Sequence, residues 1–361
     1  MSKVAVLAAG GTGGHLFPAQ ALAEALIARG WRVVLATDKR GAQYAHDFPA
    51  EERLALDAAT ASNPIAMVGA IFQILAGVAQ ARSAFSRLKP SVVVGFGGYP
   101  SVPALLAAAT TGRPIIIHEQ NAVLGRSNRA LARFARKIAA AFPTLERVPP
   151  SLGDRVEIVG NPVRADIRDL HGRAFKAKAE RLHVLITGGS QGARILSETA
   201  PRALAQIAER LRDRLHVHQQ TRSELLDSAR EIYADASIQA EVAPFFRDMA
   251  LRLGQAHLVI GRAGASTCSE LAVAGVPSIL VPLKIATDDH QRLNACSLAD
   301  AGAAMVILED DLTVDRLAEA VQAMLDDPAT LERRAAAAHT VGIPDAAERL
   351  ADLVELQAGQ G

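Results

Sequence analysis

The feature that most constrains the fold is a unit of apolar strand, glycine loop and helix that occurs twice. VAVLAAGGTGGHLFP at residues 4–18 and LHVLITGGSQGARIL at residues 182–196 share this pattern. In such a unit the backbone N–H groups of the loop and the positive end of the helix dipole meet at one point, which suits a phosphate group. The repeat predicts two similar halves, each opening with its own strand, loop and helix.

The stretches around these units predict the rest of the fold. Short β-branched runs alternate with alanine-rich helical patterns, which predicts parallel sheets with helices on both faces. Because 361 residues exceed what one core usually serves, we expect two Rossmann-like α/β domains in tandem. Further strands are expected at residues 31–37, 91–96, 114–119, 156–160, 215–221, 240–245, 257–261 and 278–283.

A proline marks the predicted domain boundary. Pro162 in GNPVR (160–164) breaks the pattern, which predicts an N-terminal domain over residues 1–163 and a C-terminal domain over residues 164–343. The segment 344–361 contains a last amphipathic helix, and we expect this helix to pack back on the first domain.

Composition excludes several classes of protein. Half of the residues are hydrophobic and 21% are charged, as in an ordinary globular protein. Cys268 and Cys296 are too few for a disulfide framework and fit a reducing cytoplasm. The N-terminus lacks a signal-peptide pattern, and the apolar run at residues 65–81 is short and interrupted by glycine and glutamine, which argues against a transmembrane helix.

Three glycine loops, GGTGGH (10–15), GFGGY (95–99) and GGSQG (188–192), each follow an expected strand. They predict one ligand cleft between the two domains. A nicotinamide or flavin cofactor is the alternative, because Asp38 ends the second strand as a ribose-binding acid would. The G-x-G-x-x-G fingerprint is incomplete, however, since Leu16 replaces its third glycine.

Six motifs in series carry a family resemblance. They are GGTGGHLFPA, GFGGYPS, HEQNAVLGRSN, GNPVR, GGSQGAR and GRAGASTCSELAVAGVPSILVP. Together they resemble the MurG family of peptidoglycan glycosyltransferases over essentially the whole chain. The resemblance implies a GT-B fold, in which two Rossmann-like domains with parallel sheets face each other across a cleft. It also implies an inverting transferase that needs no metal and no cofactor.

The same resemblance implies a reaction and a location. The family moves N-acetylglucosamine from UDP-GlcNAc to the 4-hydroxyl of undecaprenyl-pyrophosphoryl-MurNAc-pentapeptide, which converts lipid I into lipid II in peptidoglycan synthesis. It works as a peripheral protein on the cytoplasmic face of the bacterial inner membrane. The expected partners are therefore UDP-GlcNAc, lipid I and an anionic membrane surface, and no nucleic-acid motif is present.

The expected donor site lies mainly in the second half. GRAGASTCSE (261–270) places small and hydroxyl residues at a helix start, where Ala265, Ser266 and Thr267 can donate to a diphosphate. The resemblance implies that Glu270 grips both ribose hydroxyls, although a glutamate there could merely cap the helix dipole. Further implied donor contacts are Thr12, Gly13, Gly14, Asn121, Arg164, Ser190, Phe246, Cys268, Ser269 and Gln291.

Four of these contacts have more specific expectations. Arg164 and Ser190 resemble the family's diphosphate contacts, and the backbone of Phe246 matches the position that meets the uracil. Gln291 matches a donor-sugar contact, but the stretch KIATDDHQRLNA (284–295) is about one residue longer than the family form, so His290 is the alternative.

His15, at the end of the first glycine loop, is the candidate catalytic base. Sugar transfer needs a group that takes the proton of the attacking hydroxyl, and an imidazole has a suitable pKa for this task. A histidine that only bonds the backbone at a helix start is the plainer interpretation, and Glu119 and Asp289 are alternative bases. The expected acceptor contacts are Gly10, Gly11, Gly97, Gly98, Tyr99 and Glu119.

Charge is distributed unevenly along the chain. Residues 58–145 hold nine basic residues and one acid, whereas the rest holds 30 basic and 37 acidic residues. A basic field combined with an apolar helix face suits an anionic lipid surface, although such a face is more often core. The expected membrane-facing residues are Ile71, Ile74, Leu75, Val78, Arg82, Arg87, Lys89, Arg136 and Lys137.

Two other functions remain open on the sequence. A UDP-N-acetylglucosamine 2-epimerase shares the two-domain architecture but would need neither a lipid acceptor nor a basic apolar surface. A nucleotide-binding regulator with an inactive site is the second alternative. Incubation with UDP-GlcNAc and the lipid acceptor would separate all three.

Overall fold

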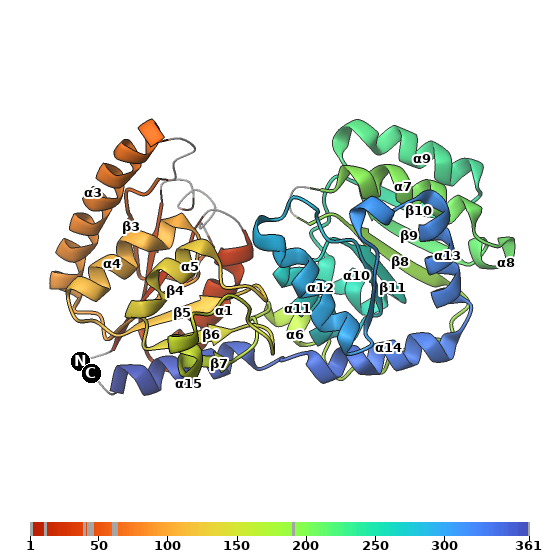
Figure 1. The fold of residues 1–361 in the computed structure, drawn as a ribbon. Helices are drawn as coiled ribbons and strands as arrows, with labels where there is room; N and C mark the ends of the chain where they lie inside the picture. Colours follow the sequence, from red (N-terminus) through yellow and green to blue (C-terminus); the bar gives the residue numbers. More distant parts are fainter. Residues whose placement is uncertain are drawn as a thin grey trace. The chain divides into compact units, whose positions relative to one another are not determined.

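The computed structural model describes residues 3–10, 13–38, 41, 47–59, 64–189 and 192–359, without the side chains of residues 13 and 64–67. The chain divides into two compact units, which are treated separately below (Figure 1). Unit 1 comprises Met1–Arg164 and Pro344–Gly361, and unit 2 comprises Ala165–Ile343. This division falls one residue after the boundary expected from Pro162.

Unit 1 is built on a parallel sheet of seven strands in the order β3-β2-β1-β4-β5-β6-β7. Its strands are β1 (Val4–Ala8), β2 (Arg32–Thr37), β3 (Glu52–Ala55), β4 (Val92–Gly95), β5 (Ile115–Glu119), β6 (Lys137–Ala140) and β7 (Val156–Ile158). Alternate residues of β1 enter two different cores, Leu7 on one face of the sheet and Val6 on the other. Burial on both faces explains why these strands read as continuous apolar runs.

Helices cover both faces of this sheet. The core around Leu7 is closed by α1 (Gly13–Ala28) and α15 (Ala346–Gly359), and the core around Val6 by α3 (Pro64–Leu88), α4 (Val102–Thr110) and α5 (Arg126–Leu131). In α15, Leu350, Leu353 and Val354 are buried in the first of these cores.

An ion-pair cluster fastens α15 to unit 1. The Arg29 guanidinium, beside the C-terminal end of α1, lies 2.7 Å from Glu348, 2.6 Å from Asp352 and 3.1 Å from Glu355. The indole N–H of Trp31 donates to Glu355 at 3.0 Å. The last helix therefore belongs structurally to the first unit of the chain.

Helix α3 combines a packed side with an exposed apolar side. Its segment Val68–Leu88 is long and apolar enough to cross a membrane by length and composition alone. Ala81 and Phe85 are nevertheless buried in the core of unit 1, and a Cβ added at Gly77 would lie 2.1 Å from the carbonyl oxygen of Asp57. This close approach packs α3 onto the unit as one of its covering helices.

Unit 2 repeats the design with six parallel strands in the order β10-β9-β8-β11-β12-β13. The strands are β8 (Leu182–Thr187), β9 (Leu215–Gln220), β10 (Gln239–Ala243), β11 (Leu258–Gly261), β12 (Ser278–Leu280) and β13 (Ala304–Val306). The helices are α6 (Ala165–Arg168), α7 (Arg194–Gln206), α8 (Glu209–Arg212), α9 (Leu226–Asp235), α10 (Met249–Gln255), α11 (Ala265–Ala274), α12 (His290–Asp300), α13 (Val314–Leu325) and α14 (Pro328–Val341).

The two parallel α/β sheets confirm the fold class expected from the sequence. Three short strands, β3, β6 and β13, were missed. Each has only three or four residues and no long β-branched run that would have marked it in the sequence. Each forms by pairing in register with a neighbouring strand, as Ile138 of β6 does with Ile117 of β5.

Histidines with a lowered pKa lie in both sheets. His118 in β5 is fully buried, and burial lowers its pKa to about 4. His183 in β8 lies among His216, His218 and His257, with ring centroids 5.2–5.9 Å away. Burial and these neighbouring imidazoles lower the pKa of His183 to about 4 as well.

We expect the free energy of unfolding to fall as the pH is lowered from about 6.5 to about 4. In that range the unfolded chain binds protons at these imidazoles and the folded chain does not, so stability rises with pH. Urea unfolding at several pH values measures the effect, and His183→Gln should reduce the slope. An equal free energy of unfolding at pH 7 and pH 5 would contradict it.

Candidate active site

The carboxyl ends of the unit 1 strands lie along one edge of the sheet, so the loops that follow them gather there. At this edge α1 carries His15 in its first turn, after the glycine loop that follows β1. The GFGGY turn follows β4, and the segment HEQN begins at the end of β5. The structure thus brings together three motifs that lie about 80 and 20 residues apart in the sequence.

His15 contacts both of the other motifs. Its Nδ1 lies 3.1 Å from Oε1 of Gln120. A Cβ added at Gly98 would lie 3.6 Å from Nε2 of His15, so the GFGGY backbone passes directly beside the ring. The side chain of His15 is half-buried, whereas His118 and Gln120 behind it are buried.

Glu119 acts as a buried anchor at this edge. One carboxylate oxygen accepts from the backbone N–H and side-chain amide of Asn121, at 3.1 and 3.2 Å. The other accepts from the backbone N–H of Gly125 at 2.9 Å and the amide of Asn128 at 2.7 Å. Glu119 is 2% exposed, so the carboxylate organises this loop, and its expected roles as an acceptor contact or alternative base stay predictions.

The glycines of the first two loops have different roles. Gly97 and Gly98 have φ values of 83° and 70°, which only glycine adopts without strain, and a Cβ at Gly97 would lie 3.1 Å from the amide of Asn128. Gly10 is buried, and a Cβ there would lie 2.8 Å from the side chain of Pro100. Protein atoms therefore fill the space that the missing side chain of Gly10 leaves, and the expected acceptor contact at its backbone stays a prediction.

Tyr99 and Asp38 form a pair at the same edge. The Tyr99 hydroxyl donates to Asp38 at 2.9 Å, and the backbone N–H of Gly41 donates to the other carboxylate oxygen at 2.9 Å. Asp38 is 5% exposed. Its carboxylate is thus engaged by the protein rather than presented as a ribose-binding acid.

The other expected residues of unit 1 are located as follows. The Arg164 guanidinium lies 5.9 Å from the ring centroid of Phe17 on α1. Gly13 and Gly14 are the first two residues of α1. Gly11, Thr12 and, in unit 2, Ser190 lie outside the described residues.

Helix α11 presents a group of backbone donors in unit 2. Gly264 is its N-cap, and the first helical hydrogen bond runs from the Cys268 N–H to the Gly264 carbonyl at 2.9 Å. The N–H groups of Ala265, Ser266 and Thr267 precede that bond. Ser269 and Glu270 follow on the same helix and are half-buried.

Cys268, one of the expected donor contacts, is the fourth residue of α11. Its side chain is fully buried, and this burial raises the pKa of its thiol. Its backbone N–H is already used within the helix. Cys268 therefore packs in the core of unit 2 rather than facing a ligand.

The loop before α12 holds the expected sugar contact. Oε1 of Gln291 accepts from the backbone N–H of Leu283 at 3.0 Å, while Nδ1 of His290 lies 2.7 Å from the carbonyl of Thr287. Asp288 and Asp289 have φ values of 58° and 57°, a left-handed conformation in the stretch that was expected to be longer than the family form. Asp289 accepts from Arg292, so its carboxylate is held within this segment.

Gln220 is a site residue that sequence reasoning missed. Its Oε1 accepts from the Thr187 hydroxyl at 2.9 Å and from the Gly188 N–H at 3.3 Å. Its Nε2 donates to the carbonyls of Gly189 at 2.9 Å and Pro244 at 3.3 Å. It joins the GGSQG loop to the segment before Phe246, and as the last residue of β9 it carries no signal in the sequence that would have marked it.

The side chain of Phe246 has a structural role of its own. It is 5% exposed, and the Arg252 guanidinium lies 3.8 Å from its ring centroid. Arg252 in turn pairs with Glu241 at 2.7 Å and Asp248 at 2.8 Å. These contacts hold the loop whose backbone was expected to meet the uracil.

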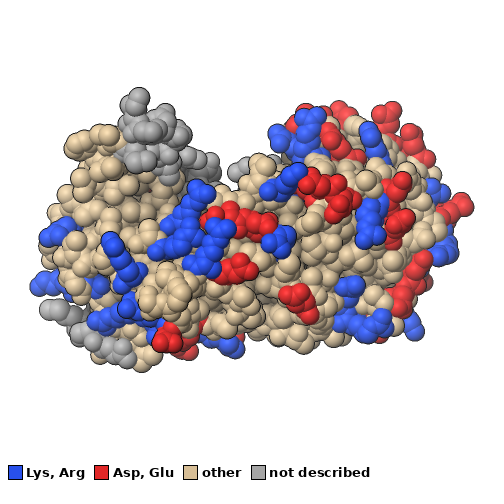
Figure 2. Space-filling model, viewed as in Figure 1, with Lys and Arg blue, Asp and Glu red and all other residues tan. Residues whose placement is uncertain are grey.

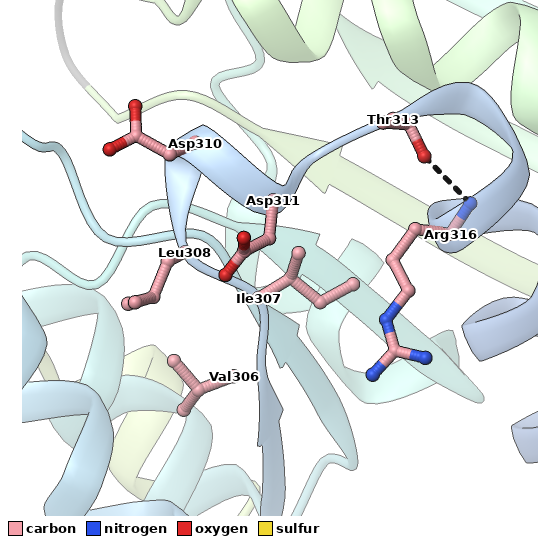
Figure 3. Close-up of a pocket in the computed structure, with 7 residues that line it drawn as sticks. All are labelled: Val306, Ile307, Leu308, Asp310, Asp311, Thr313 and Arg316. Atoms are coloured by element: carbon pink, nitrogen blue, oxygen red, sulfur yellow. Dashed lines mark hydrogen bonds between the residues drawn. The ribbon is translucent and has the colours of Figure 1, made fainter.

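A separate hollow of about 510 Å³ lies after β13 in unit 2 (Figure 3). It is lined by Val306, Ile307, Leu308, Asp310, Asp311, Thr313 and Arg316. Thr313 caps α13 by accepting from the backbone N–H of Arg316 at 3.1 Å, as the dashed line in Figure 3 shows. None of the residues expected to bind donor or acceptor lines this hollow.

The expected membrane-facing residues are only partly exposed. Ile71 and Leu75 are 50% and 57% exposed, but Ile74 is half-buried. Val78 is also half-buried and packs against the core of unit 1. Val68 and Phe72, which the sequence analysis did not select, are 58% and 68% exposed.

The basic residues of this group differ in their partners. Arg82, Arg87, Lys89 and Arg136 are exposed and Lys137 is half-buried. Arg87 pairs with Glu52 at 2.5 Å and Lys137 with Glu157 at 3.2 Å, which offsets part of their charge. In Figure 2 the surface over α3 is almost entirely tan, with blue residues around its lower end.

Comparison with known proteins places the chain in a family. Residues 5–140 match the glycosyltransferase family 28 N-terminal domain, and residues 183–350 match the glycosyltransferase family 28 C-terminal domain. A Caulobacter vibrioides protein is 62% identical over 98% of this chain and 99% of its own length. It is named UDP-N-acetylglucosamine–N-acetylmuramyl-(pentapeptide) pyrophosphoryl-undecaprenol N-acetylglucosamine transferase.

Solved structures agree with this match. The crystal structure of Acinetobacter baumannii MurG has a TM-score of 0.81 and 34% identity, covering 98% of this chain and 99% of that one. A candidate UDP-N-acetylglucosamine 2-epimerase from Listeria monocytogenes has a TM-score of 0.70 but 15% identity over 100% of this chain and 98% of that one, so it shares the fold alone. The chain therefore belongs to glycosyltransferase family 28 and, within it, to the MurG family of N-acetylglucosamine transferases.

Proposed function

We propose that this chain transfers N-acetylglucosamine from UDP-GlcNAc to the 4-hydroxyl of the muramyl sugar in lipid I, forming lipid II with inversion at the anomeric carbon. The observation that carries this function is the edge of unit 1, where His15, the GFGGY turn and the HEQN segment meet, in a chain 62% identical to a named transferase of this reaction. The 2-epimerase alternative has only the shared fold in its favour.

Unit 2 is the proposed donor site. The N–H groups of Ala265, Ser266 and Thr267 at the start of α11 bind the diphosphate, because they precede the helical hydrogen bonds and lie at the positive end of the helix dipole. Glu270, one turn further along, accepts from both ribose hydroxyls. Since backbone donors stabilise the leaving diphosphate, the transfer proceeds without a metal ion.

The remaining donor contacts are proposed from the family resemblance. The backbone of Phe246 meets the uracil, and the amide of Gln291 or the imidazole of His290 meets the sugar. Gln220 positions the GGSQG loop through its four hydrogen bonds, and so acts on the diphosphate indirectly. Arg164, Ser190 and Asn121 complete the proposed set.

Unit 1 is the proposed acceptor site. Gly97, Gly98 and Tyr99 approach the acceptor pyrophosphate through the backbone of the GFGGY turn, in which Gly98 and Tyr99 are half-buried. His15 takes the proton of the 4-hydroxyl while the hydroxyl oxygen attacks the anomeric carbon. The bond between that carbon and the UDP oxygen breaks, and its electron pair leaves with UDP. The anchored carboxylate of Glu119 holds the surrounding loop in place.

Unit 1 also carries the proposed membrane surface, and the protein acts as a peripheral protein on the cytoplasmic face of the inner membrane. Val68, Ile71, Phe72 and Leu75 recur at helical spacing on the exposed side of α3. Arg82 lies further along the same helix and is exposed. Apolar side chains next to basic ones are the combination that binds anionic lipid.

A transfer assay tests the function. After exhaustive chelation, the full chain should form lipid II and UDP from UDP-GlcNAc and lipid I, and His15→Ala should lower kcat by about 10²–10⁴-fold. UDP affinity should change little, because most of the proposed donor contacts lie in unit 2. Epimerised donor without acceptor consumption would identify the 2-epimerase, and a raised acceptor KM at normal kcat would make His15 a binding residue.

Glu270→Ala should weaken UDP binding by about 1–3 kcal/mol, because the ribose hydroxyls lose a charged acceptor. Isothermal calorimetry with UDP measures the change. Glu319→Ala, which removes an exposed glutamate of α13 in the same unit, is the matched control. Equal dissociation constants for both variants and the wild type would leave Glu270 a structural residue.

The full chain should co-sediment with anionic vesicles more strongly than with neutral vesicles. The difference should shrink with added salt, since exposed charges are screened over about 8–10 Å at physiological ionic strength. Phe72→Ser with Leu75→Ser should weaken binding to both kinds of vesicle, while Ile158→Ser, at an exposed site on β7, should not. Equal binding to neutral and anionic vesicles would remove the role of charge.

A further inference from the structure

A continuous row of hydrogen bonds leads from a backbone carbonyl to His15. The Gly160 carbonyl oxygen lies 3.0 Å from Nε2 of His118. Nδ1 of His118 lies 3.0 Å from Nε2 of Gln120, and Oε1 of Gln120 lies 3.1 Å from Nδ1 of His15. Three of these four residues come from the segment after β7 and the end of β5, and only His15 is half-buried.

The protonation of His118 is fixed at the far end of the row. A carbonyl oxygen only accepts, so Nε2 of His118 must carry the hydrogen that faces Gly160. Burial lowers the pKa of His118 to about 4, so its imidazole is neutral near pH 7. Its Nδ1 is therefore a lone pair that can only accept.

This lone pair fixes the orientation of the Gln120 amide. Nε2 of Gln120 donates to Nδ1 of His118 and also to the His118 carbonyl oxygen, at 3.0 and 3.2 Å. A reversed amide would place its own oxygen against two acceptors. Oε1 of Gln120 must therefore face His15.

The orientation of Gln120 in turn fixes the tautomer of His15. Because Oε1 only accepts, Nδ1 of a neutral His15 carries the hydrogen, and Nε2 is left with the lone pair. Nε2 lies on the side of the ring next to Gly98, where a Cβ would be 3.6 Å away. The absence of a side chain at Gly98 keeps this nitrogen open toward the GFGGY turn.

We propose that His118 and Gln120 are positioning residues that set the tautomer of His15, so that Nε2 of His15 is the nitrogen that takes the proton of the acceptor hydroxyl. This inference rests on the proposed function and deepens it. As the hydroxyl oxygen bonds to the anomeric carbon and UDP departs with the electron pair, the proton moves to Nε2. The resulting imidazolium keeps its Nδ1–H bond to Gln120 and later releases the proton to solvent.

The tautomer can be observed directly in the unmodified full chain. Nitrogen-15 NMR of histidine-labelled protein, at a pH where the shifts show neutral imidazoles, distinguishes Nδ1–H from Nε2–H, and His15→Gln identifies the His15 signals. We expect His15 as the Nδ1–H form and His118 as the Nε2–H form. An Nε2–H form of His15 in the wild type would overturn the proposal.

Gln120→Leu then tests the consequence for catalysis. Without the amide acceptor, part of His15 should shift to the Nε2–H form. The kcat should fall at least about tenfold, within the loss expected on removing the base, while the Kd for UDP stays the same. Gln20→Leu, at a half-buried glutamine on the same helix as His15 whose amide donates to Glu24 at 3.0 Å, is the matched control and should change none of these values.

The outcomes separate this proposal from the proposed function. Transfer activity in the wild type, together with full activity and an unchanged His15 tautomer in Gln120→Leu, would refute the positioning role alone. No transfer by the wild type would refute the proposed function, while the NMR result would still decide the tautomer. If Gln120→Leu does not fold, the wild-type spectrum alone decides.

Discussion

The hydrogen bonds to the buried carboxylate of Glu119 are the interaction on which the candidate active site of unit 1 depends. A charge in such a place is tolerated only when hydrogen bonds replace its hydration, and here four N–H donors do so. Asn128, one of the four donors, lies against Gly97 of the GFGGY turn, and Gly98 of that turn lies against His15. The hydrogen bonds of the Glu119 carboxylate thus help to fix the position of His15, the candidate base.

Three successive residues at the end of β5, His118, Glu119 and Gln120, have two different roles. Because side chains alternate along a strand, His118 and Glu119 point to opposite faces of the sheet. Glu119 organises the loop that follows, while His118 and Gln120 reach His15 on α1. A substitution at Glu119 should therefore disturb the loop, and one at His118 or Gln120 should disturb the hydrogen bond to His15. An apolar strand that ends in consecutive buried polar residues is a pattern that can be sought in other sequences of this architecture.

Elements that a local sequence pattern specifies could be predicted, whereas elements and roles that depend on contacts between distant residues were missed. Long β-branched strands and the glycine loops were predicted, but β3, β6 and β13 owe their existence to neighbouring strands. A glycine in a motif does not reveal whether its empty space is for a ligand or, as at Gly10, for Pro100. The role of Gln220 could not be predicted, because it depends on hydrogen bonds to four partners spread over residues 187–244.

The return of α15 to unit 1 has a consequence for the order in which the chain can fold. Unit 2 is continuous, so all of its residues have been synthesised once Ile343 is added. Unit 1 at that moment still lacks Leu350, Leu353 and Val354 from its core and the carboxylates that pair with Arg29. During translation, therefore, unit 1 begins first but is completed last. A chain that lacks the last turns of α15 leaves the core of unit 1 exposed on the side that this helix covers.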